Sequence, residues 1–131
     1  ELFCNTLDSD AHAFFAEIAH LRVSAHFFID RGGIVSQYVA TQDRAWHAGV
    51  SQWCGRDNCN DFSIGIELEG TDDTPYSAQQ YRQLAQLIQC LRREYPHIAA
   101  NAIVGHNDIA PGRKTDPGPA FDWQRLHRAL A

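Results

Sequence analysis

Apolar and polar residues alternate along this chain with two different periods, which predict strands interleaved with helices. The clearest period of two covers residues 62–70, FSIGIELEG, where aromatic and aliphatic residues alternate with Ser, Gly and Glu. Such alternation is typical of a half-buried strand, so Glu67 and Glu69 are expected on the face opposite the apolar one. Residues 23–29 and 34–39 are predicted to form a hairpin around a glycine-containing turn.

Helical spacing of apolar residues predicts three helices. The first covers residues 10–21, the second follows Ser77 and ends before Pro96, and the third starts near Asp122. Ser77 and Gln80 have the spacing of a capping box, in which each side chain bonds the other residue's backbone amide. The apolar stripes expected to be buried are Phe14, Phe15, Ile18 and Leu21; Tyr81, Leu84, Ile88, Leu91 and Tyr95; and Trp123, Leu126 and Leu130.

A short apolar run, AIVGH at residues 102–106, is predicted to be a buried strand that delivers His106 to the end of the sheet. Helices and strands are interleaved, so the expected fold class is α/β or α+β, with a central mixed β-sheet flanked by helices. Binding groups in such sheets collect at strand ends and in the loops beyond them. Residues 105–118, GHNDIAPGRKTDPG, form such a loop, and their Pro and Gly residues argue against a helix or a central strand.

The composition narrows the class of protein. The chain has 131 residues, of which 44% are hydrophobic and 21% charged, as expected for one globular domain. No apolar run approaches the roughly 20 residues that a membrane span needs. The net charge of −5 disfavours a nucleic-acid partner, because phosphate binding requires a basic face.

The four cysteines bear on the cellular compartment. None of them has C-x-x-C spacing, although Cys54 and Cys59 are close enough in sequence to be bridged in an oxidising compartment. No targeting segment is visible, so four free thiols in a reducing cytoplasm are the favoured expectation.

The loop at residues 105–118 carries the strongest candidate chemistry. His106 and Asp116 are residue types that bind zinc, and a catalytic zinc has three protein ligands and an open position for water. Lys114 could stabilise a developing oxyanion, and Glu67 or Glu69 could act as general base. The alternative is an ordinary polar surface loop with a turn at Asp116 and a solvated lysine.

For the other candidate residues, a structural role is more common than a functional one. His26 and His47 could line a cleft, but a hydrogen-bonded structural histidine is the commoner finding. Trp46 and Trp53 could stack against a sugar, although large aromatic residues are usually part of a core.

Four stretches closely resemble one enzyme family. They are LRVSAH (21–26), RAWHAGVS (44–51), CNDFSIGIELEGTD (59–72) and GHNDIAPGRKTDPGPAFDW (105–123). Together they resemble the AmpD-type 1,6-anhydro-N-acetylmuramyl-L-alanine amidases, which belong to a wider zinc amidase group that includes phage amidases and peptidoglycan recognition proteins. The resemblance implies a mixed sheet flanked by helices. It also implies hydrolysis of the amide between anhydro-muramic acid and L-Ala during bacterial cell-wall recycling in the cytoplasm.

The resemblance also implies roles for individual residues. His106 and Asp116 take the places of two zinc ligands, and Lys114 takes that of the oxyanion-stabilising lysine. Glu67, rather than Glu69, falls at the acid/base glutamate.

Three further residues resemble substrate-binding positions. Arg22 resembles the arginine that receives a stem-peptide carboxylate, and Trp46 falls in the stretch that lines the substrate groove. Arg56 lies in the loop where a second carboxylate-binding arginine often occurs, although Asn58 aligns equally well.

The third zinc ligand of the family is a His on an N-terminal strand. This chain contains no Met and starts at Glu1 with no such strand, so we expect a single amidase domain over residues 1–131 that lacks it. The expected cofactor is Zn²⁺, and the expected partner is an anhydro-muropeptide substrate. We expect no nucleic-acid or membrane partner, and we expect the protein to be a monomer. Two rival hypotheses are a non-catalytic muropeptide-binding module of the same fold and a secreted amidase that acts on polymeric wall.

Overall fold

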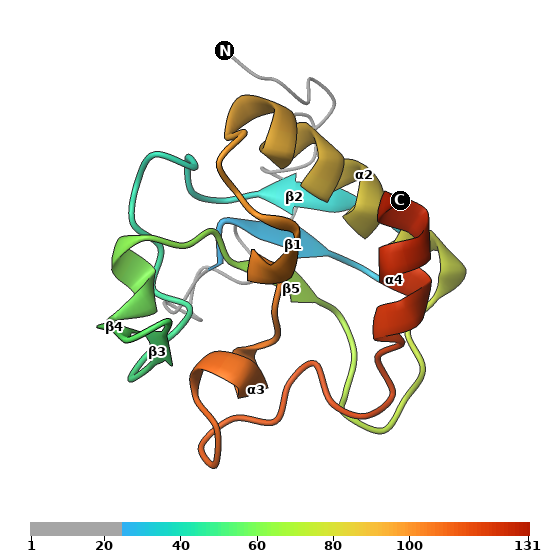
Figure 1. Cartoon of the computed structure of the whole chain (residues 1–131). Helices are drawn as coiled ribbons and strands as arrows, with labels where there is room; N and C mark the ends of the chain where they lie inside the picture. The colour runs from blue at the N-terminus through green and yellow to red at the C-terminus, as the bar shows by residue number, and fades with distance from the viewer. Residues whose placement is uncertain (1–24) are drawn as a thin grey trace.

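A three-stranded mixed sheet lies at the centre of residues 25–131, the part of the chain that the computed structural model describes (Figure 1). Strand β1 (Phe27–Ile29) pairs antiparallel with β2 (Val35–Gln37) and parallel with β5 (Ile66–Leu68), in the order β2-β1-β5. The predicted hairpin and the mixed sheet are therefore confirmed, although each strand is shorter than its alternating pattern. The helix predicted at residues 10–21 lies outside the described residues.

Helix α2 (Ala78–Glu94) begins with the predicted capping box. The Ser77 hydroxyl accepts from the Gln80 amide at 3.1 Å, and the Gln80 side chain accepts from the Ser77 amide at 2.9 Å. The buried Gln80 carboxamide also donates to the carbonyls of Ile29 at 3.2 Å and Glu69 at 2.9 Å. These bonds connect the start of the helix to the ends of β1 and β5.

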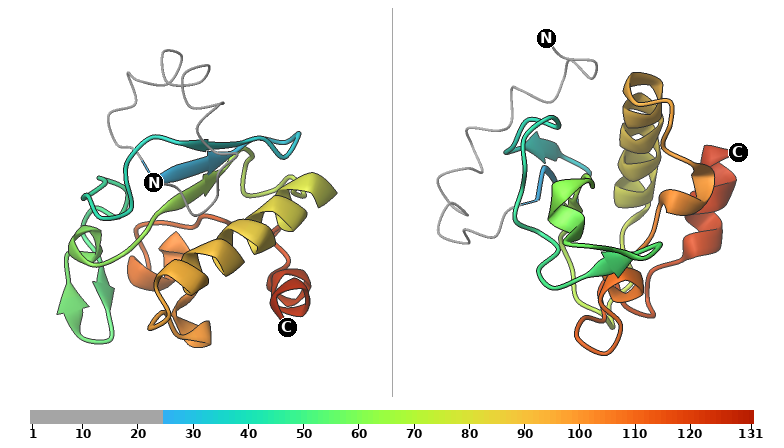
Figure 2. Two further views of the ribbon diagram at one scale, coloured as in Figure 1. Left: turned by 90° about the horizontal axis from the view of Figure 1, so that it is seen from above. Right: turned by 60° about the vertical axis from the view of Figure 1, so that its left-hand side comes forward.

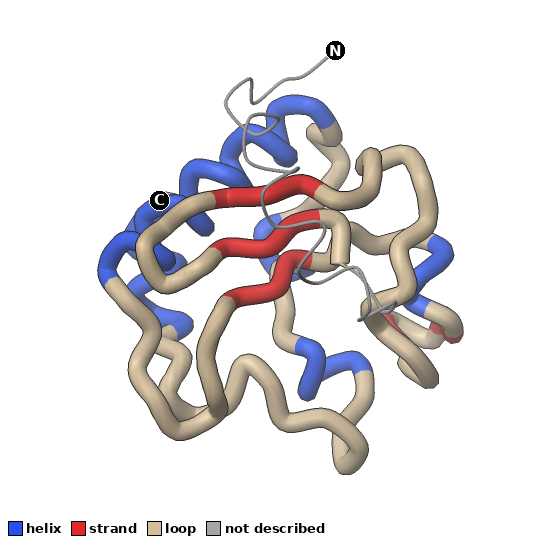
Figure 3. The backbone as a smooth tube through the Cα atoms, turned by 180° about the vertical axis from the view of Figure 1, so that it is seen from behind, coloured by secondary structure: helices blue, strands red, loops and turns tan. Residues whose placement is uncertain are grey.

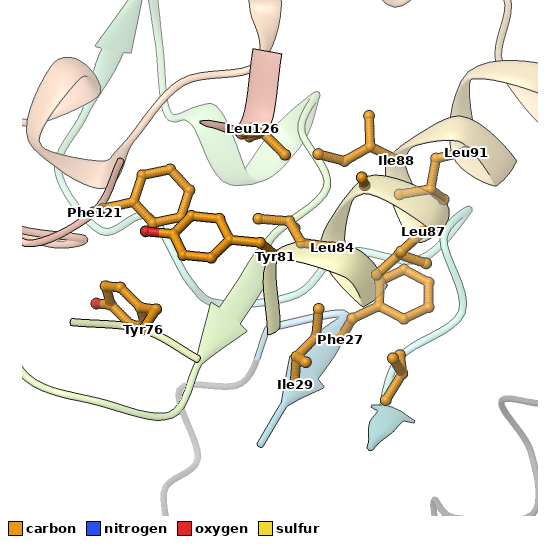
Figure 4. Close-up of a cluster of buried hydrophobic side chains, with 12 residues drawn as sticks. Phe27, Ile29, Tyr76, Tyr81, Leu84, Leu87, Ile88, Leu91, Phe121 and Leu126 are labelled. Atoms are coloured by element: carbon orange, nitrogen blue, oxygen red, sulfur yellow. The ribbon is translucent and has the colours of Figure 1, made fainter. Parts of the chain in front are cut away.

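Helices α2 and α4 (Trp123–Leu130) cover one face of the sheet, as the views in Figures 2 and 3 show. The predicted stripe of α2 is buried except for Tyr95, which is half-buried. In α4, Leu126 is buried, whereas Trp123 and Leu130 are only partly buried. The core side chains drawn in Figure 4 include Phe27, Ile29, Tyr76, Tyr81, Leu84, Leu87, Ile88, Leu91, Phe121 and Leu126.

The strand predicted at residues 102–106 is wrong. Ala102 ends a 3₁₀ helix, η4 (Ala100–Ala102), and His106 begins a one-turn helix, α3 (His106–Ile109). The Asp108 carboxylate accepts from the Gly105 amide at 2.8 Å, so a local side chain satisfies a backbone donor that a strand partner would otherwise take. No described strand pairs with this segment, and α3 also contradicts the expectation that the following loop contains no helix.

A small hairpin that was not predicted lies apart from the central sheet (Figure 1). It pairs β3 (Gln52–Trp53) with β4 (Arg56–Asp57) and leads into the 3₁₀ helix η3 (Cys59–Asp61). Its turn residues Cys54 and Gly55 both have positive φ, 52° and 78°, as a two-residue hairpin turn with strand-matching twist requires. None of the described helices is long and apolar enough to cross a membrane.

The cysteines differ from expectation. Cys54 and Cys59 are free thiols, so the alternative of a bridge between them is wrong. Cys90 is disulfide-bonded, so the expectation of four free thiols is wrong as well.

Candidate active site

His106 and Asp116 face each other across the loop at residues 105–118. The His106 Nδ1 atom lies 3.3 Å from Asp116 Oδ2. The loop is closed by a backbone bond, because the Asn107 amide donates to the Asp116 carbonyl at 3.0 Å. The His106 side chain is mostly buried, at 17% exposure, whereas that of Asp116 is 54% exposed. The loop therefore brings together the two side chains proposed as metal ligands and keeps one of them open to solvent.

The other ring nitrogen of His106 identifies the tautomer. His106 Nε2 lies 2.9 Å from the backbone oxygen of Ala48. A carbonyl oxygen only accepts hydrogen bonds, so Nε2 carries the proton and donates. In the neutral ring, the lone pair of Nδ1 then faces the Asp116 carboxylate. Two electron-pair donors that face each other in this way can bind one cation between them.

The spacing of these two donors fits one tetrahedral zinc ion. Nitrogen and oxygen ligands about 2.0–2.2 Å from zinc, at a tetrahedral angle, lie about 3.3–3.5 Å from each other. The His106–Asp116 distance of 3.3 Å matches this separation. Within residues 25–131, no third His, Cys, Asp or Glu completes the set that could hold a metal ion. The described residues thus fit two ligands of a zinc site.

Glu67 lies in the middle strand position of β5, opposite Phe28 of β1. Partial removal from water raises the pKa of its carboxyl group, and the Asp116 carboxylate raises it further. His106 and Lys114 act on the same carboxyl group in the opposite direction. These three groups are therefore close enough to act on the Glu67 carboxyl group.

Glu69 is engaged elsewhere. One of its carboxylate oxygens accepts from the backbone amide of Arg31 at 2.9 Å, beyond the end of β1. The structure thus separates two carboxylates that alternation alone could not distinguish, and only Glu67 lines the cavity described below.

Lys114 is exposed, on the same loop as the two proposed ligands. Its backbone amide donates to the Ala110 carbonyl at 3.0 Å, which places it one turn beyond α3. Its ammonium group makes no ion pair with any described residue. The cation is therefore available to a negatively charged group in the site.

The far end of the loop is anchored from the chain that follows β5. The Thr115 hydroxyl donates to the Asp72 carboxylate, and the Tyr76 hydroxyl donates to the Pro117 carbonyl at 2.9 Å. Burial, followed by the charges of Asp72 and Asp116, raises the pKa of the Tyr76 phenol, so that it stays a donor. The residues before and after Asp116, Thr115 and Pro117, are therefore both anchored.

A cavity of about 990 Å³ adjoins these groups. Its walls include Glu67, His106, Lys114 and Asp116, together with His47 and Trp53. The lining also includes core residues such as Leu84, Ile88 and Leu126, so this volume extends beyond the polar groups of the site.

The residues predicted to bind substrate lie away from the cavity or outside the described residues. Trp46 is 56% exposed and is covered on one face by the Arg44 guanidinium, 4.1 Å from the ring centroid. Arg56 stacks 4.2 Å over the ring of Phe62. Neither Trp46 nor Arg56 lines the cavity, and Arg22 lies outside the described residues.

His26 has the structural role that was favoured for it. The residue is 1% exposed. Its Nδ1 accepts from the Gly65 amide at 3.1 Å, and its Nε2 donates to the Asp43 carbonyl at 2.8 Å. Both ring nitrogens are satisfied, and burial lowers the pKa of the ring.

His47 lies at the cavity wall. A Cβ atom on Gly65 would come within 2.5 Å of the His47 ring, so only glycine leaves room for the imidazole there. Burial lowers the pKa of His47 to about 4, with smaller contributions from the neighbouring His26 and His106. A neutral imidazole therefore faces the site.

A family comparison identifies the chain. The model of the N-acetylmuramoyl-L-alanine amidase family Amidase_2 matches residues 2–119. The chain belongs to this family. Among curated relatives, 1,6-anhydro-N-acetylmuramyl-L-alanine amidase AmpD of Enterobacter cloacae is 64% identical over 129 residues, which are 98% of this chain and 68% of the relative.

Solved structures agree with this amidase assignment. The crystal structure of a selenomethionine AmpD derivative superposes with a TM-score of 0.81 at 56% identity, covering 98% of this chain and 72% of the other. AmpDh3 from Pseudomonas aeruginosa, in complex with anhydromuramic pentapeptide, gives a TM-score of 0.77 at 38% identity, with 88% and 55% covered. The resemblance to AmpD-type amidases, the fold class and the assignment as an amidase are therefore confirmed.

Proposed function

We propose that this amidase hydrolyses the amide between 1,6-anhydro-N-acetylmuramic acid and the L-Ala of the stem peptide in recycled muropeptides, and that it depends on zinc. The observation that carries this proposal is the 3.3 Å convergence of His106 Nδ1 and Asp116 Oδ2, with Glu67 and Lys114 at the same cavity. The substrate class is supported by the AmpD relative and by AmpDh3, whose structure contains an anhydromuramic pentapeptide.

His106 and Asp116 would hold the zinc ion. When bound, zinc lowers the pKa of water towards about 7 and polarises a carbonyl group. A catalytic site requires a third protein ligand. We assign this ligand to the histidine of an N-terminal strand that the family resemblance implies, outside the described residues.

Glu67 and Lys114 would carry out the remaining chemistry. Glu67 takes a proton from the water that attacks the lactyl carbonyl carbon. In the metal-free protein, burial raises the pKa of the Glu67 carboxyl group, which favours a part in proton transfer. The Lys114 ammonium stabilises the negative charge that develops on the carbonyl oxygen. Glu67 then returns the proton to the L-Ala nitrogen as the C–N bond breaks.

A non-catalytic muropeptide-binding module of the same fold is not favoured. The curated relatives of this chain are named as amidases. A binding module would also have no need of a carboxyl group with a raised pKa beside a lysine cation that makes no ion pair with residues 25–131, and both features are present here. The monomeric state and the cytoplasmic location stay predictions.

The deciding experiment uses the full-length protein. Zinc content is measured, and hydrolysis of anhydro-muropeptide is followed with and without a chelator. We expect bound zinc, loss of hydrolysis on chelation, and recovery when zinc is returned. Hydrolysis that persists after complete removal of metal would contradict zinc dependence. Binding of the muropeptide without hydrolysis by the zinc-loaded protein would favour the binding module.

A further inference from the structure

The backbone oxygen of Ala48 joins the segment at residues 45–51 to the loop that carries the proposed ligands. It accepts two hydrogen bonds, one from His106 Nε2 at 2.9 Å and one from Arg113 Nη2 at 2.7 Å. Both lone pairs of the oxygen are therefore used. Arg113 also donates to the Val50 carbonyl, from Nη2 at 2.8 Å and from Nε at 3.2 Å. One guanidinium group thus grips two carbonyls of the same segment.

The same segment is held on its other side by Asn60. This residue is 7% exposed, and its Oδ1 accepts from the His47 amide at 2.9 Å and the Ala48 amide at 2.8 Å. The segment has no regular secondary structure of its own. Its geometry around Ala48 therefore depends on Asn60 at the amide side and Arg113 at the carbonyl side.

Gly49 shows how closely the guanidinium approaches. Its φ of 64° lies in the left-handed region, and a Cβ atom there would meet Arg113 Nη2 at 2.8 Å. Glycine is thus required at this position by both its backbone conformation and the space it leaves. Arg113 itself is not among the residues that line the cavity, so it reaches the site through the Ala48 carbonyl.

The position of this carbonyl decides which nitrogen of His106 carries the proton. Without the Ala48 acceptor, a neutral imidazole could carry its proton on Nδ1 and donate it to the Asp116 carboxylate, 3.3 Å away. Such a charge-assisted bond is favourable and would occupy the lone pairs that a metal needs. With the acceptor in place, the proton is held on Nε2 and the Nδ1 lone pair stays directed at Asp116.

We propose that Arg113 is a positioning residue for this site. By holding the Ala48 carbonyl against His106 Nε2, it keeps His106 in the Nε2–H tautomer and its Nδ1 ready to bind a metal ion. The expected effect on zinc affinity rests on the proposed zinc function. The tautomer of His106 does not, because it can be measured in the metal-free protein. Partners that orient a ligating histidine typically change metal affinity by about 10–100-fold when removed.

The test compares three variants of the full-length protein. Arg113→Ala removes the hydrogen bonds to the Ala48 and Val50 carbonyls. Arg113→Lys keeps the positive charge but lacks the planar guanidinium group that donates to both carbonyls. Arg31→Ala is the matched control, because Arg31 Nη2 donates to the Pro75 carbonyl at 2.8 Å and does not line the cavity.

The first readout is the pair of ring ¹⁵N chemical shifts of His106 in metal-free protein, at a pH where the ring is neutral. We expect the Nε2–H tautomer in wild type and in Arg31→Ala, and a larger share of the Nδ1–H tautomer in Arg113→Ala. The second readout is zinc affinity measured against a competing chelator. We expect a loss of about 10–100-fold in Arg113→Ala, a smaller loss in Arg113→Lys and none in Arg31→Ala. At saturating zinc, kcat should recover with KM unchanged.

The proposal is overturned if wild-type His106 carries its proton on Nδ1, or if Arg113→Ala keeps both the wild-type tautomer and the wild-type zinc affinity. If Arg113→Ala does not fold, Arg113→Lys decides by the same two readouts. If the wild-type protein binds no zinc at all, the proposed function fails, and the tautomer readout still decides the role of Arg113.

Discussion

The loop at residues 105–118 and the segment at residues 44–61 border the same site, but they are held in different ways. The first is tied to distant parts of the fold at several points, including the Asp72 carboxylate, the Tyr76 hydroxyl and the Ala48 carbonyl. In the second, the outward-facing candidates pack mainly against near neighbours in sequence. Trp46 lies under Arg44, and Arg56 lies over Phe62.

This difference bears on what each region can do in catalysis. Reacting groups must be held close to a productive geometry, and long-range contacts supply that restraint. An exposed aromatic or guanidinium group held by a local stacking contact can contribute to binding but cannot fix a reacting atom. We therefore expect the loop at residues 105–118 to determine metal binding and kcat, and the exposed side chains of the segment at residues 44–61 to affect KM.

The largest effect is expected for Asp116. Asp116→Ala removes one of the two donors that converge at 3.3 Å. We expect zinc affinity to fall by more than about 100-fold, beyond the loss typical of an orienting partner, and hydrolysis to approach background. Chelator competition and anhydro-muropeptide hydrolysis measure the two effects.

The matched control for Asp116 comes from the other region. Asp57 is an exposed β4 carboxylate that accepts from the Gln52 side chain at 3.1 Å, so Asp57→Ala should leave zinc affinity unchanged. Wild-type zinc affinity in Asp116→Ala would remove this residue from the ligand set and abolish the contrast between the two regions.

Lys114 should come next in size. Lys114→Ala should keep the fold and the zinc but lower kcat by about 10²–10³, the usual loss for an oxyanion stabiliser. The lysine cation lowers the pKa of Glu67, so its removal should also move the acidic limb of the pH profile of kcat/KM to higher pH.

Lys114→Arg, which keeps the cation, is the control for the pH effect. It should leave the acidic limb near its wild-type position even if kcat falls. Full turnover by Lys114→Ala, with metal content and fold intact, would rule out the role assigned to the lysine.

The parts of this picture that sequence reasoning predicted are those set by local patterns. The hairpin of β1 and β2 follows from alternation around a glycine turn, and α2 follows from the Ser77–Gln80 capping box. His106 and Asp116 converge because a short loop rich in Pro and Gly leaves little freedom between them. In each case the pattern behind the prediction is local in sequence, although distant contacts also hold the loop at residues 105–118 in place.

The parts that were missed depend on tertiary contacts. The apolar run at residues 102–106 has a strand pattern, but a strand also needs a partner, and no described segment pairs with it. The Ala48 carbonyl leaves no signature in sequence because every residue has one. Arg113 adjoins Lys114 in the loop, yet its acceptors lie more than 60 residues away.

An effect on stability is expected for His47, in the segment at residues 44–61. Burial holds the pKa of His47 at about 4, below the value of 6.5 for an unperturbed histidine. Between these values the unfolded chain binds a proton that the folded protein does not. The free energy of unfolding should therefore be highest above pH 6.5 and fall by about 3 kcal/mol as the pH drops through 4.

Urea unfolding at a series of pH values measures this slope. His47→Gln should reduce the slope, because the variant has no titrating group at the position, and the buried His26 accounts for part of the slope that stays. His97→Gln, at an exposed position after α2, is the matched control and should leave the slope as in wild type. An unchanged slope in His47→Gln would show that another group causes the acid sensitivity.

The smallest effects are expected for Trp46 and Arg56. Each makes an exposed cation–π contact, worth about 0.5–1 kcal/mol, and neither lines the cavity. Because both contacts lie within the protein and neither side chain lines the cavity, Trp46→Ala and Arg56→Ala should raise KM only slightly and leave kcat unchanged. Trp53→Ala is the informative comparison, because Trp53 does line the cavity and should raise KM further. A larger KM effect for Trp46 than for Trp53 would mean that the muropeptide extends over the exposed segment, and the boundary between the two regions would have to be redrawn.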